Sequence, residues 1–356
     1  MKLSAILVAA AAGERIDDAG FMLAAERADL YELAFCADAI RRRLHPGNVV
    51  TYVIDRNINY TDICISGCTF CAYYKAPGQG GSVLPRQELL AKIEETKQLG
   101  GTQILLQGGL HPDLPLEWYE DLVRCIKATG IHLHGFSPPE IQHLSHLSGL
   151  EIDEVLGRLI GAGLDSIPGG GAEILSDRVR SRIAPRKCSA DQWLAVMEAA
   201  HRQGLRTTAT MMFGHIETMA ERLEHLRRLR DLQDRTGGFT AFIPWPFQAD
   251  NTVLGSQQRF ATSGLAYLRM LALSRIYLDN IANLQASWVT QGPKIAQVSL
   301  FFGANDFGST MIEENVVAAA GVSFRLGEEE IRRLVADAGF TPRQRLMDYR
   351  MVEKSL

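Results

Sequence analysis

The feature of this sequence that most constrains its fold is a regular alternation of short apolar runs with longer amphipathic stretches. The short runs are rich in β-branched residues and resemble buried strands, whereas the stretches between them have helical periodicity. Strands are predicted at 49–54, 102–106, 131–136, 164–167, 206–212, 239–243, 284–289 and 298–302. Such alternation is typical of parallel sheets with right-handed crossovers. Eight units in about 270 residues favour a (β/α)8 barrel over an open sheet.

The chain divides into three predicted parts of one α/β unit. Residues 1–48 have apolar positions at helical spacing and predict two or three short helices that pack on the barrel as an extension. The barrel itself is expected to occupy residues 49–325. Residues 326–356 are expected to form a helical or extended tail of the same unit. Polar, glycine-rich segments follow the predicted strands, at the rim where barrels of this kind place their active sites.

Charge and hydropathy exclude several classes of partner. The formal net charge is -4, so no basic excess is present to attract nucleic acid or an anionic membrane surface. The apolar run 4–12 imitates a short signal peptide, but it continues directly into a further amphipathic stretch. We therefore interpret this run as a packing helix and expect a cytoplasmic protein. No other apolar segment approaches the roughly 20 residues that span a bilayer.

Three of the six cysteines lie within eight positions of one another, at Cys64, Cys68 and Cys71. A chain of this length does not need disulfides, and clustered cysteines more often serve metal binding or catalysis. Three thiolates on one polar loop can hold three irons of a cubane cluster and leave the fourth iron open. A zinc site would need a fourth ligand, and the next histidine is His111.

The cysteine loop resembles the signature of the radical S-adenosylmethionine (SAM) superfamily, C-x3-C-x-aromatic-C, with Phe70 at the aromatic position. The resemblance implies a 4Fe-4S cluster on Cys64, Cys68 and Cys71, with SAM bound to the open iron and near Phe70. It also implies a 5′-deoxyadenosyl radical that removes a hydrogen atom from a substrate. An electron donor such as flavodoxin or ferredoxin would reduce the cluster.

Two further strand ends carry candidate SAM contacts. Gln107, Gly108 and Gly109 end the second predicted strand and resemble the glycine pair that presents backbone atoms to the amino group of SAM. Glycine allows such a close approach because it has no side chain. Glu173 follows the glycine-rich residues 168–172 after the fourth strand and is a candidate acceptor for the ribose hydroxyls of SAM. The alternative for Glu173 is a helix-starting residue that complements the helix dipole.

Candidates for catalysis follow later strands. His215 and Glu217 lie after the fifth strand and could transfer a proton or bind a polar substrate group, although a loop histidine and a helix-starting glutamate would look the same. Asp306 could bind a ribose or a carboxylate, or cap a helix. The aromatic segment 242–247 could form the wall of a ligand pocket or simply pack.

Longer strings resemble one family more closely, the dehypoxanthine futalosine cyclases of menaquinone biosynthesis. They lie at 55–74, 105–113, 166–178, 211–218 (MMFGHIET), 233–247 and 286–315 (ASWVTQGPKIAQVSLFFGANDFGSTMIEEN). The resemblance implies that the radical removes the 4′ hydrogen of the substrate ribose. The resulting carbon radical attacks the benzoate ring of the same molecule, and loss of an electron and a proton completes the cyclisation.

Other functions remain open at this point. His215, Glu217 or Asp306 could accept the proton, and the sequence does not choose among them. Aminofutalosine synthase and the deazaflavin synthases share the cysteine motif and are the alternative enzymes. A zinc-binding structural module is a remote alternative. In each enzyme reading the partner is a small nucleoside-like molecule, without nucleic acid or membrane.

Overall fold

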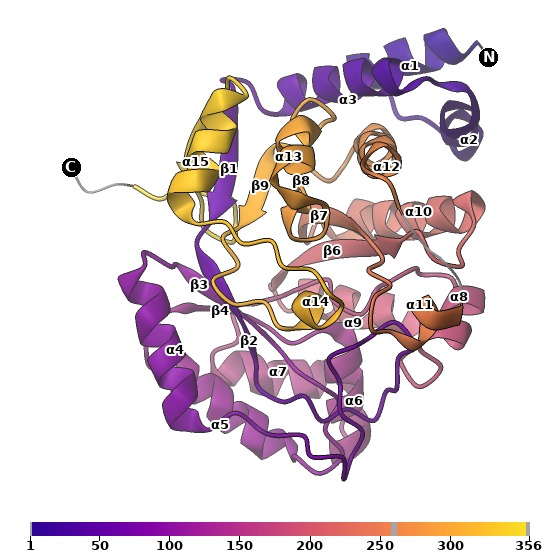
Figure 1. Ribbon diagram of the computed structural model, residues 1–356. Coiled ribbons are helices and arrows are strands. Elements are labelled where there is room, and N and C mark those ends of the chain that lie inside the picture. Colours follow the sequence, from indigo (N-terminus) through magenta and orange to yellow (C-terminus); the bar gives the residue numbers. More distant parts are fainter. Residues whose placement is uncertain (1, 258–261, 354–356) are drawn as a thin grey trace.

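The computed structural model describes residues 2–257 and 262–353 and contains a curved sheet of seven parallel strands (Figure 1). Neighbouring strands follow one another in chain order and pair in parallel. This is the arrangement that successive β–α–β units produce. The strands are β2 (Asp55–Asn59), β3 (Gln103–Gln107), β4 (His132–Gly135), β5 (Ser166–Ile167), β6 (Arg206–Phe213), β7 (Phe239–Pro246) and β8 (Asn283–Leu284).

Three more strands form a second parallel sheet, in the order β10, β1, β9. β1 (Val49–Val53) runs almost directly into β2 and pairs in parallel with both β9 (Asp306–Ser309) and β10 (Thr341–Gln344). An isolated parallel bridge joins Gln285, just after β8, to Asp306 at the start of β9. The predicted α/β barrel of parallel strands is therefore confirmed, with β9 and β1 completing the wall between β8 and β2.

Helices cover the outside of this wall (Figure 1). The long ones are α4 (Arg86–Gln98), α5 (Leu116–Lys127), α6 (Pro138–Ser148), α7 (Ile152–Ala162), α9 (Ala190–Arg202), α10 (Met219–Thr236), α12 (Gly264–Tyr277) and α13 (Trp288–Ser299). The shorter ones are α8 (Asp177–Ile183), α11 (Val253–Gln257) and α14 (Val316–Ala319). Local sequence sets several of their ends, since Ser189 and Thr218 form capping boxes that start α9 and α10, and Gly237 ends α10 in the left-handed conformation.

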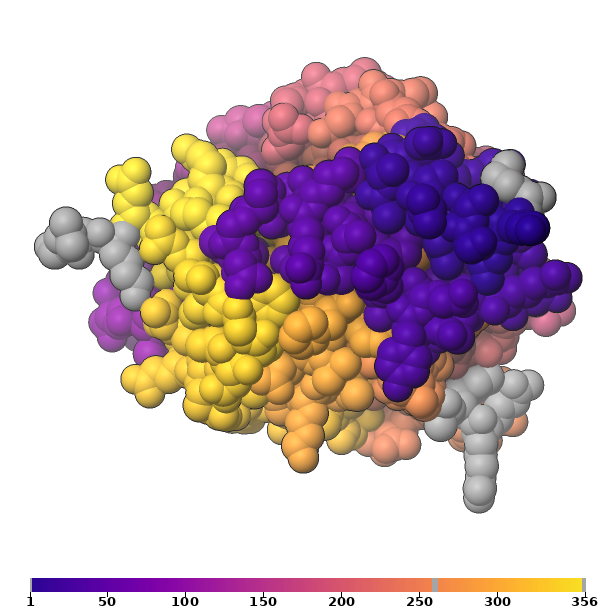
Figure 2. All heavy atoms as spheres, turned by 90° about the horizontal axis from the view of Figure 1, so that it is seen from above, coloured from indigo at the N-terminus to yellow at the C-terminus, as the bar shows by residue number. Residues whose placement is uncertain are grey.

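The N-terminal segment forms α1 (Leu3–Ala12), α2 (Asp18–Arg27) and α3 (Leu30–Leu44). These helices lie across one end of the barrel, which Figure 2 shows from above. Ile6 and Leu7 of α1 are buried, and α3 packs along α12. The apolar N-terminal run is thus a packed helix, and none of the described helices is long and apolar enough to cross a membrane.

The C-terminal segment contributes α15 (Glu328–Asp337) and β10. β10 pairs with β1 from Val49↔Thr341 to Tyr52↔Gln344, so residues from the two ends of the barrel sequence share one sheet. The boundaries at 48 and 325 stay a prediction, and the three predicted parts include residues 1, 258–261 and 354–356, which lie outside the described residues.

Two predicted strands are wrong in position. The seventh predicted strand, 284–289, shrinks to β8 because Trp288 already begins α13. The eighth, 298–302, covers the end of α13 and the turn after it, and the closing strand is β9 instead. Gly292 has a φ of 75°, which breaks the helical backbone of α13, and Pro293 follows it. These two residues hid the helical periodicity of this segment in the sequence. The apolar residues at 298–302 looked like a strand because the end of the helix buries Leu300 and Phe302.

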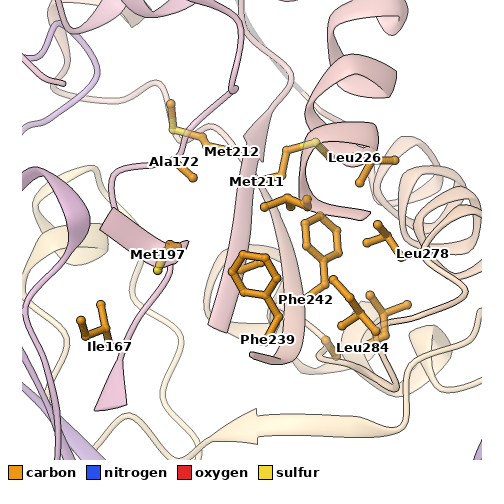
Figure 3. Packing of buried hydrophobic residues seen from close by; sticks show 14 of the residues in the cluster. Ile167, Ala172, Met197, Met211, Met212, Leu226, Phe239, Phe242, Leu278 and Leu284 are labelled. Atoms are coloured by element: carbon orange, nitrogen blue, oxygen red, sulfur yellow. The ribbon is translucent and has the colours of Figure 1, made fainter. Parts of the chain in front are cut away.

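Apolar side chains fill the space between the wall and the helices. Figure 3 shows buried residues from the β5–β8 part of the wall together with Met197 of α9 and Leu226 of α10. Phe239 and Phe242 of β7 belong to the same cluster and are buried. This packing fixes the strands, so that the loops at their carboxyl ends are held on a rigid support.

Candidate active site

A cavity of about 290 Å³ lies inside the barrel, and strands and loops from both ends of the chain line it. Its walls are largely apolar and include Leu105, Ile243, Trp245, Trp288 and Met311. Polar side chains enter at separate points and are Asp55, Asn57, Gln103, Gln107, His134, Glu173, Thr208, Thr210, Gln285, Ser287, Thr290, Ser309, Glu314, Arg345 and Tyr349. Apolar walls with a few placed polar groups are typical of small-molecule sites.

The three clustered cysteines lie on the loop that follows β2. The backbone N–H of Leu110 donates to Cys64 Sγ at 3.2 Å, and the N–H of Ser66 lies 3.4 Å from the same sulfur. The Ser66 hydroxyl contacts Cys68 Sγ at 3.0 Å. Burial raises the pKa of the Cys68 thiol to about 11. Among the described residues, no three His, Cys, Asp or Glu side chains are grouped to hold one metal ion.

Glycines let the cysteine loop and the loop after β3 touch. A Cβ on Gly109 would overlap the carbonyl oxygen of Ile63, and one on Gly108 would lie 2.5 Å from the Tyr60 ring. Gly67 has φ 59° and lies against the guanidinium of Arg186. Only residues without a side chain permit this approach, so the end of β3 lies directly beside the cysteines.

Glu140 holds the backbone at this junction. Its Oε1 accepts from the N–H of Gly108 at 3.1 Å and from the Tyr60 hydroxyl at 2.7 Å, and its Oε2 accepts from Ser137 at 2.5 Å. Burial raises the pKa of Glu140 to about 7. Glu140 lies on α6, a helix that the sequence pattern does not predict, so no sequence signal marked it as a site residue.

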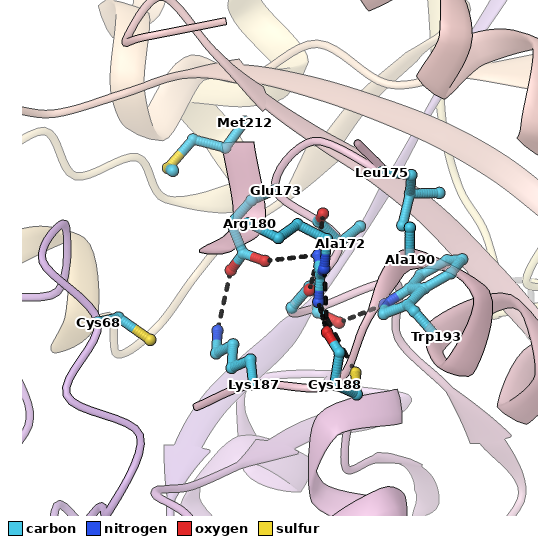
Figure 4. Close-up of polar contacts among 12 residues, drawn as sticks. Cys68, Ala172, Glu173, Leu175, Arg180, Lys187, Cys188, Ala190, Trp193 and Met212 are labelled. Carbon is cyan, nitrogen blue, oxygen red and sulfur yellow. Dashed lines mark hydrogen bonds and ion pairs between the residues drawn. The ribbon is translucent and has the colours of Figure 1, made fainter. Parts of the chain in front are cut away.

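Glu173 lies in a buried charged network on the loop after β5 (Figure 4). Its Oε1 accepts from Lys187 Nζ at 2.9 Å, and its Oε2 lies 3.5 Å from Arg180 Nη1 but forms no hydrogen bond. The backbone of Glu173 has φ 40°, a conformation that is uncommon for residues other than glycine. Glu173 therefore has one carboxylate oxygen that is ion-paired but accepts no hydrogen bond, and the residue lines the cavity.

Lys187 and Arg180 build this environment from opposite sides. Arg180 donates to the carbonyl oxygens of Ala172 and Cys188 and so ties the Glu173 loop to the segment before α9. Lys187 is placed over the ring of Phe70 at 5.1 Å, between Glu173 and Cys68 (Figure 4). Burial lowers the pKa of Lys187, but Cys68 and Glu173 raise it by more, so its pKa lies above the ordinary value and the amine is charged.

Comparisons with known proteins show the family of the chain. The pattern of the radical SAM superfamily matches residues 58–229, and the CofH/MqnC C-terminal region matches residues 236–356. The chain is 44% identical to the cyclic dehypoxanthine futalosine synthase of Halalkalibacterium halodurans, over 99% of this chain and 95% of that protein. It is 45% identical to the synthase of the same name from Streptomyces coelicolor, over 98% and 88% of the two chains.

The chain belongs to the radical SAM superfamily. A further relative, the 5-amino-6-(D-ribitylamino)uracil–L-tyrosine 4-hydroxyphenyl transferase 1 of Methanosarcina barkeri, is 42% identical over 91% of this chain and 88% of its own. Among solved structures, the hydrogenase maturase HydG has a TM-score of 0.76 at 16% identity, covering 96% of this chain and 75% of its own. Methylornithine synthase PylB has a TM-score of 0.72 at 16% identity, covering 95% and 97%. At this identity the two structures support the radical SAM fold alone.

This radical SAM enzyme uses the cofactors of its superfamily, a 4Fe-4S cluster and SAM. The residues present fit both groups. Three cysteine sulfurs lie on one loop, and two backbone N–H groups donate to that of Cys64. Gln107 and Glu173 line a common cavity, and one carboxylate oxygen of Glu173 accepts no hydrogen bond. Gly170 completes this surface, because a Cβ there would overlap Gln107 Nε2.

His215 and Glu217 of the radical SAM enzyme do not line the cavity. Glu217 accepts from the N–H groups of Gly214 and His215, at 2.6 and 2.9 Å, and pairs with Arg222 at 2.6 Å. His215 Nε2 lies 3.0 Å from the carbonyl oxygen of Met212, and its Nδ1 lies 3.1 Å from Glu217 Oε2 without hydrogen-bond geometry. Burial lowers the pKa of His215. The pair holds the turn before α10, and its catalytic role stays a prediction.

Asp306 is also fully engaged. Its Oδ2 accepts from Arg345 Nε at 2.8 Å and from the Tyr349 hydroxyl at 2.6 Å, and its Oδ1 accepts from the N–H of Gly308 at 2.9 Å. The carboxylate is buried and is not among the groups that line the cavity. Its geometry is that of an anchor for the C-terminal segment, and a role as proton acceptor stays a prediction.

Several polar residues deep in the barrel were not predicted as site residues. Asp55 and Asn57 alternate along β2 and line the cavity, as do Gln103, His134 and Arg345. Burial lowers the pKa of His134 to about 3, so its imidazole is neutral, and burial raises the pKa of Asp55. A signal existed for Asp55 and Asn57, since polar residues at every second position of a strand point to one face. No local signal placed Arg345 in the barrel.

Proposed function

We propose that this radical SAM enzyme converts dehypoxanthine futalosine to its cyclic product in menaquinone biosynthesis. The observation that carries the proposal is the 44–45% identity to two cyclic dehypoxanthine futalosine synthases along nearly the whole chain. That identity spans the C-terminal residues that form β9, α15 and β10, so it includes parts of the barrel beyond the cysteine motif.

The proposed cluster ligands are Cys64, Cys68 and Cys71, since they are the clustered cysteines and their loop contacts the end of β3 at Gly109. Phe70 and the backbone of residues 107–109 would border SAM, and Glu173 would accept hydrogen bonds from its ribose. What supports the role of Glu173 is a buried carboxylate oxygen without a hydrogen-bond partner. A buried acceptor of this kind is costly unless a ligand or water satisfies it.

When bound, the cluster and SAM supply a 5′-deoxyadenosyl radical that removes a hydrogen atom from the substrate. The protein's own residues bind and orient. The apolar walls around Trp245 and Trp288 suit the aromatic ring of the substrate and keep water from the carbon radical. Because attacking carbon and ring belong to one molecule, holding the substrate folded replaces a bimolecular encounter. Ring closure would leave a radical on the aromatic ring. That radical would regain aromaticity by passing one electron to an oxidised iron–sulfur or flavin carrier and one proton to a base, in addition to the abstracted hydrogen atom.

We further propose that a flavodoxin or ferredoxin supplies the electron that starts each turnover. The partial exposure of the cysteine loop supports a protein as the electron donor, because Cys64 and Cys71 retain contact with solvent. His215, Glu217 and Asp306 remain hypotheses for the proton acceptor, and the hydrogen bonds that already occupy them argue for water or a substrate group in that role.

A second candidate activity has a specific observation in its favour. Several archaeal relatives named as aminouracil–tyrosine 4-hydroxyphenyl transferases are 39–42% identical to this chain. Such an enzyme would join 5-amino-6-(D-ribitylamino)uracil to a fragment of tyrosine. The higher identity and longer coverage of the synthases favour the cyclase.

The test is a pair of parallel assays with anaerobically reconstituted protein, SAM and dithionite. One assay contains dehypoxanthine futalosine, and the other contains tyrosine with the ribitylaminouracil. We expect a product two hydrogens lighter than dehypoxanthine futalosine, formed together with 5′-deoxyadenosine, and no coupled product in the second assay. The reverse pattern would replace the proposed function by the second candidate. Cys68→Ser protein, treated identically, is the control for chemistry that does not depend on the cluster.

A further inference from the structure

Two amide oxygens in the lower part of the barrel lack hydrogen-bond partners. Asn57 Oδ1 and Gln103 Oε1 are buried, and both residues line the cavity. The exposed fractions of the two residues are 4% and 5%. An unsatisfied buried acceptor usually marks a place that water or a ligand donor occupies.

Neighbouring carboxylates fix the direction of these amides. Asn57 Nδ2 donates to Glu314 Oε2 at 2.8 Å, and Gln103 Nε2 donates to Asp55 Oδ2 at 2.8 Å. Glu314 is itself held by the backbone N–H groups of residues 316 and 317, and Asp55 accepts from Ser309. Because carboxylate oxygens accept, the amide nitrogens face them and the amide oxygens face away.

The two acceptors lie on adjacent strands. β2 and β3 pair in parallel, with Asp55 opposite Gln103 and Asn57 opposite Leu105. Asn57 and Gln103 are therefore offset by one inward-facing position, and the spacing of strands places them within reach of neighbouring hydroxyls on a single ligand. Gln107, which pairs with Asn59 nearer the cysteine loop, also lines the cavity.

We propose that Asn57 and Gln103 form a subsite that binds hydroxyl groups of the substrate. The inference rests on the proposed function and deepens it, since the substrate of the proposed cyclase carries a ribose. Acceptor oxygens recognise hydroxyl donors and disfavour carboxylate or phosphate oxygens. Glu314 and Asp55 act as positioning residues that aim the amide oxygens. The subsite lies deeper in the barrel than Glu173, so substrate and SAM hydroxyls have separate acceptors.

The experiment measures equilibrium binding to SAM-loaded enzyme with an oxidised cluster, in which no turnover occurs. Titration calorimetry gives the Kd of dehypoxanthine futalosine and, separately, of SAM. The variants are Asn57→Leu and Gln103→Met, which keep side-chain size and remove the acceptor. Thr102→Val is the matched control, because Thr102 Oγ1 is also a buried unpaired atom but does not line the cavity.

Each variant is expected to weaken substrate binding about three- to tenfold, the effect of one neutral hydrogen bond, and to leave the Kd of SAM within about twofold. Analogues that lack the 2′ or 3′ hydroxyl should bind wild-type protein more weakly by a similar factor. The matching variant should show no further loss with the matching analogue. Unchanged substrate affinity in both variants overturns the subsite, and so does a deoxy penalty that persists in them.

The design separates this inference from the proposed function. If the wild-type protein processes the ribitylaminouracil instead, the proposed function fails, and the same variants are titrated with that polyhydroxylated compound, where a three- to tenfold loss supports the subsite. If a variant does not fold, the deoxy analogues decide with wild-type protein: equal affinity for all analogues overturns the subsite. Wild-type protein that binds neither compound overturns both proposals.

Discussion

Lys187 donates to Glu173 across 2.9 Å, and this pair joins the segment before α9 to the loop after β5. Glu173 is buried with 5% of its side chain exposed, and Lys187 is largely buried with 16% exposed. The next cation, Arg180, lies 3.5 Å from the other carboxylate oxygen. Its guanidinium donates hydrogen bonds to backbone carbonyl oxygens instead. Lys187 is therefore the main partner of the Glu173 carboxylate.

Lys187→Met should destabilise the protein by about 3 kcal/mol, because breaking a buried pair leaves an uncompensated charge. The measurement is urea unfolding of the cluster-free protein. Lys97→Met is the matched control, since Lys97 is exposed and its 3.7 Å pair with Glu94 lies at the surface, and it should change stability by at most about 1 kcal/mol. Equal effects of the two substitutions would contradict the assigned partnership.

Replacing any of Cys64, Cys68 or Cys71 by serine should abolish SAM cleavage and remove most of the iron that reconstitution introduces. A missing thiolate leaves one iron of the cubane without its protein ligand. The readouts are iron and sulfide content, visible absorption and 5′-deoxyadenosine. Cys125→Ser, a substitution on α5 outside the loop, should retain iron and activity. An equal loss in this variant would contradict the assignment of the three loop cysteines as cluster ligands.

Gly109→Ala should impair cluster assembly, although the residue supplies no ligand. The added methyl group would overlap the carbonyl oxygen of Ile63, so the cysteine loop or the end of β3 must shift. We expect lower iron occupancy after reconstitution and a lower melting temperature. Gly161→Ala is a suitable control, because nothing lies within 4 Å of a Cβ at this position on α7 and alanine favours helix. Normal iron content in the Gly109 variant would contradict this prediction, because it would show that the backbone near Ile63 can shift without impairing cluster assembly.

Stability should depend on pH through Glu140. Burial raises its pKa from 4.5 to about 7, so the folded protein keeps a proton that the unfolded chain releases. The stability contributed by the neutral acid is fully present below pH 4.5 and is lost as the pH rises to about 7. Glu140→Gln cannot ionise and keeps the acceptor for Gly108. Its stability relative to wild type should therefore rise by about 3 kcal/mol across this interval, measured by urea unfolding. A constant difference would refute the raised pKa.

Asp306→Asn should release the C-terminal segment. The substitution leaves the buried guanidinium of Arg345 without its charged partner, which costs about 3–5 kcal/mol. The measurements are urea unfolding and the rate of tryptic cleavage at Arg345. Asp348→Asn, which breaks an exposed pair with Arg350, should change stability by at most about 1 kcal/mol. If Asp306 were instead the proton acceptor, the variant would form 5′-deoxyadenosine with little product, and we expect this ratio to stay at the wild-type value.

The regular part of the fold was predictable because parallel strands buried on both faces are apolar and the helices between them are amphipathic. β2 escaped detection because its inward side chains Asp55 and Asn57 are polar and line the cavity. β10 escaped because half of its residues are exposed and it contains Pro342. Hydropathy reports burial in an apolar core and does not register strands that face a polar cavity or an edge.

The candidate site was predictable where its functional residues lie close together in the sequence at a characteristic spacing. The cysteine spacing and the glycines at 108 and 109 are visible in the sequence, and the structure places them together. His215 and Glu217 looked available only because sequence does not show that Arg222 and backbone N–H groups already occupy the carboxylate. The Arg345 contact with Asp306 joins residues 39 apart, and no local pattern encodes it.

The pairing of β1 with β10 imposes an order on how the protein is made. Val49 leaves the ribosome about 290 residues before Thr341, and at roughly 5–20 residues per second this delay lasts on the order of 15–60 s. During that time the first strand of the barrel has neither its final neighbour nor the Arg345 anchor. A nascent chain that stops early would keep this edge and the cavity floor open, and would present them to chaperones and proteases rather than to substrate.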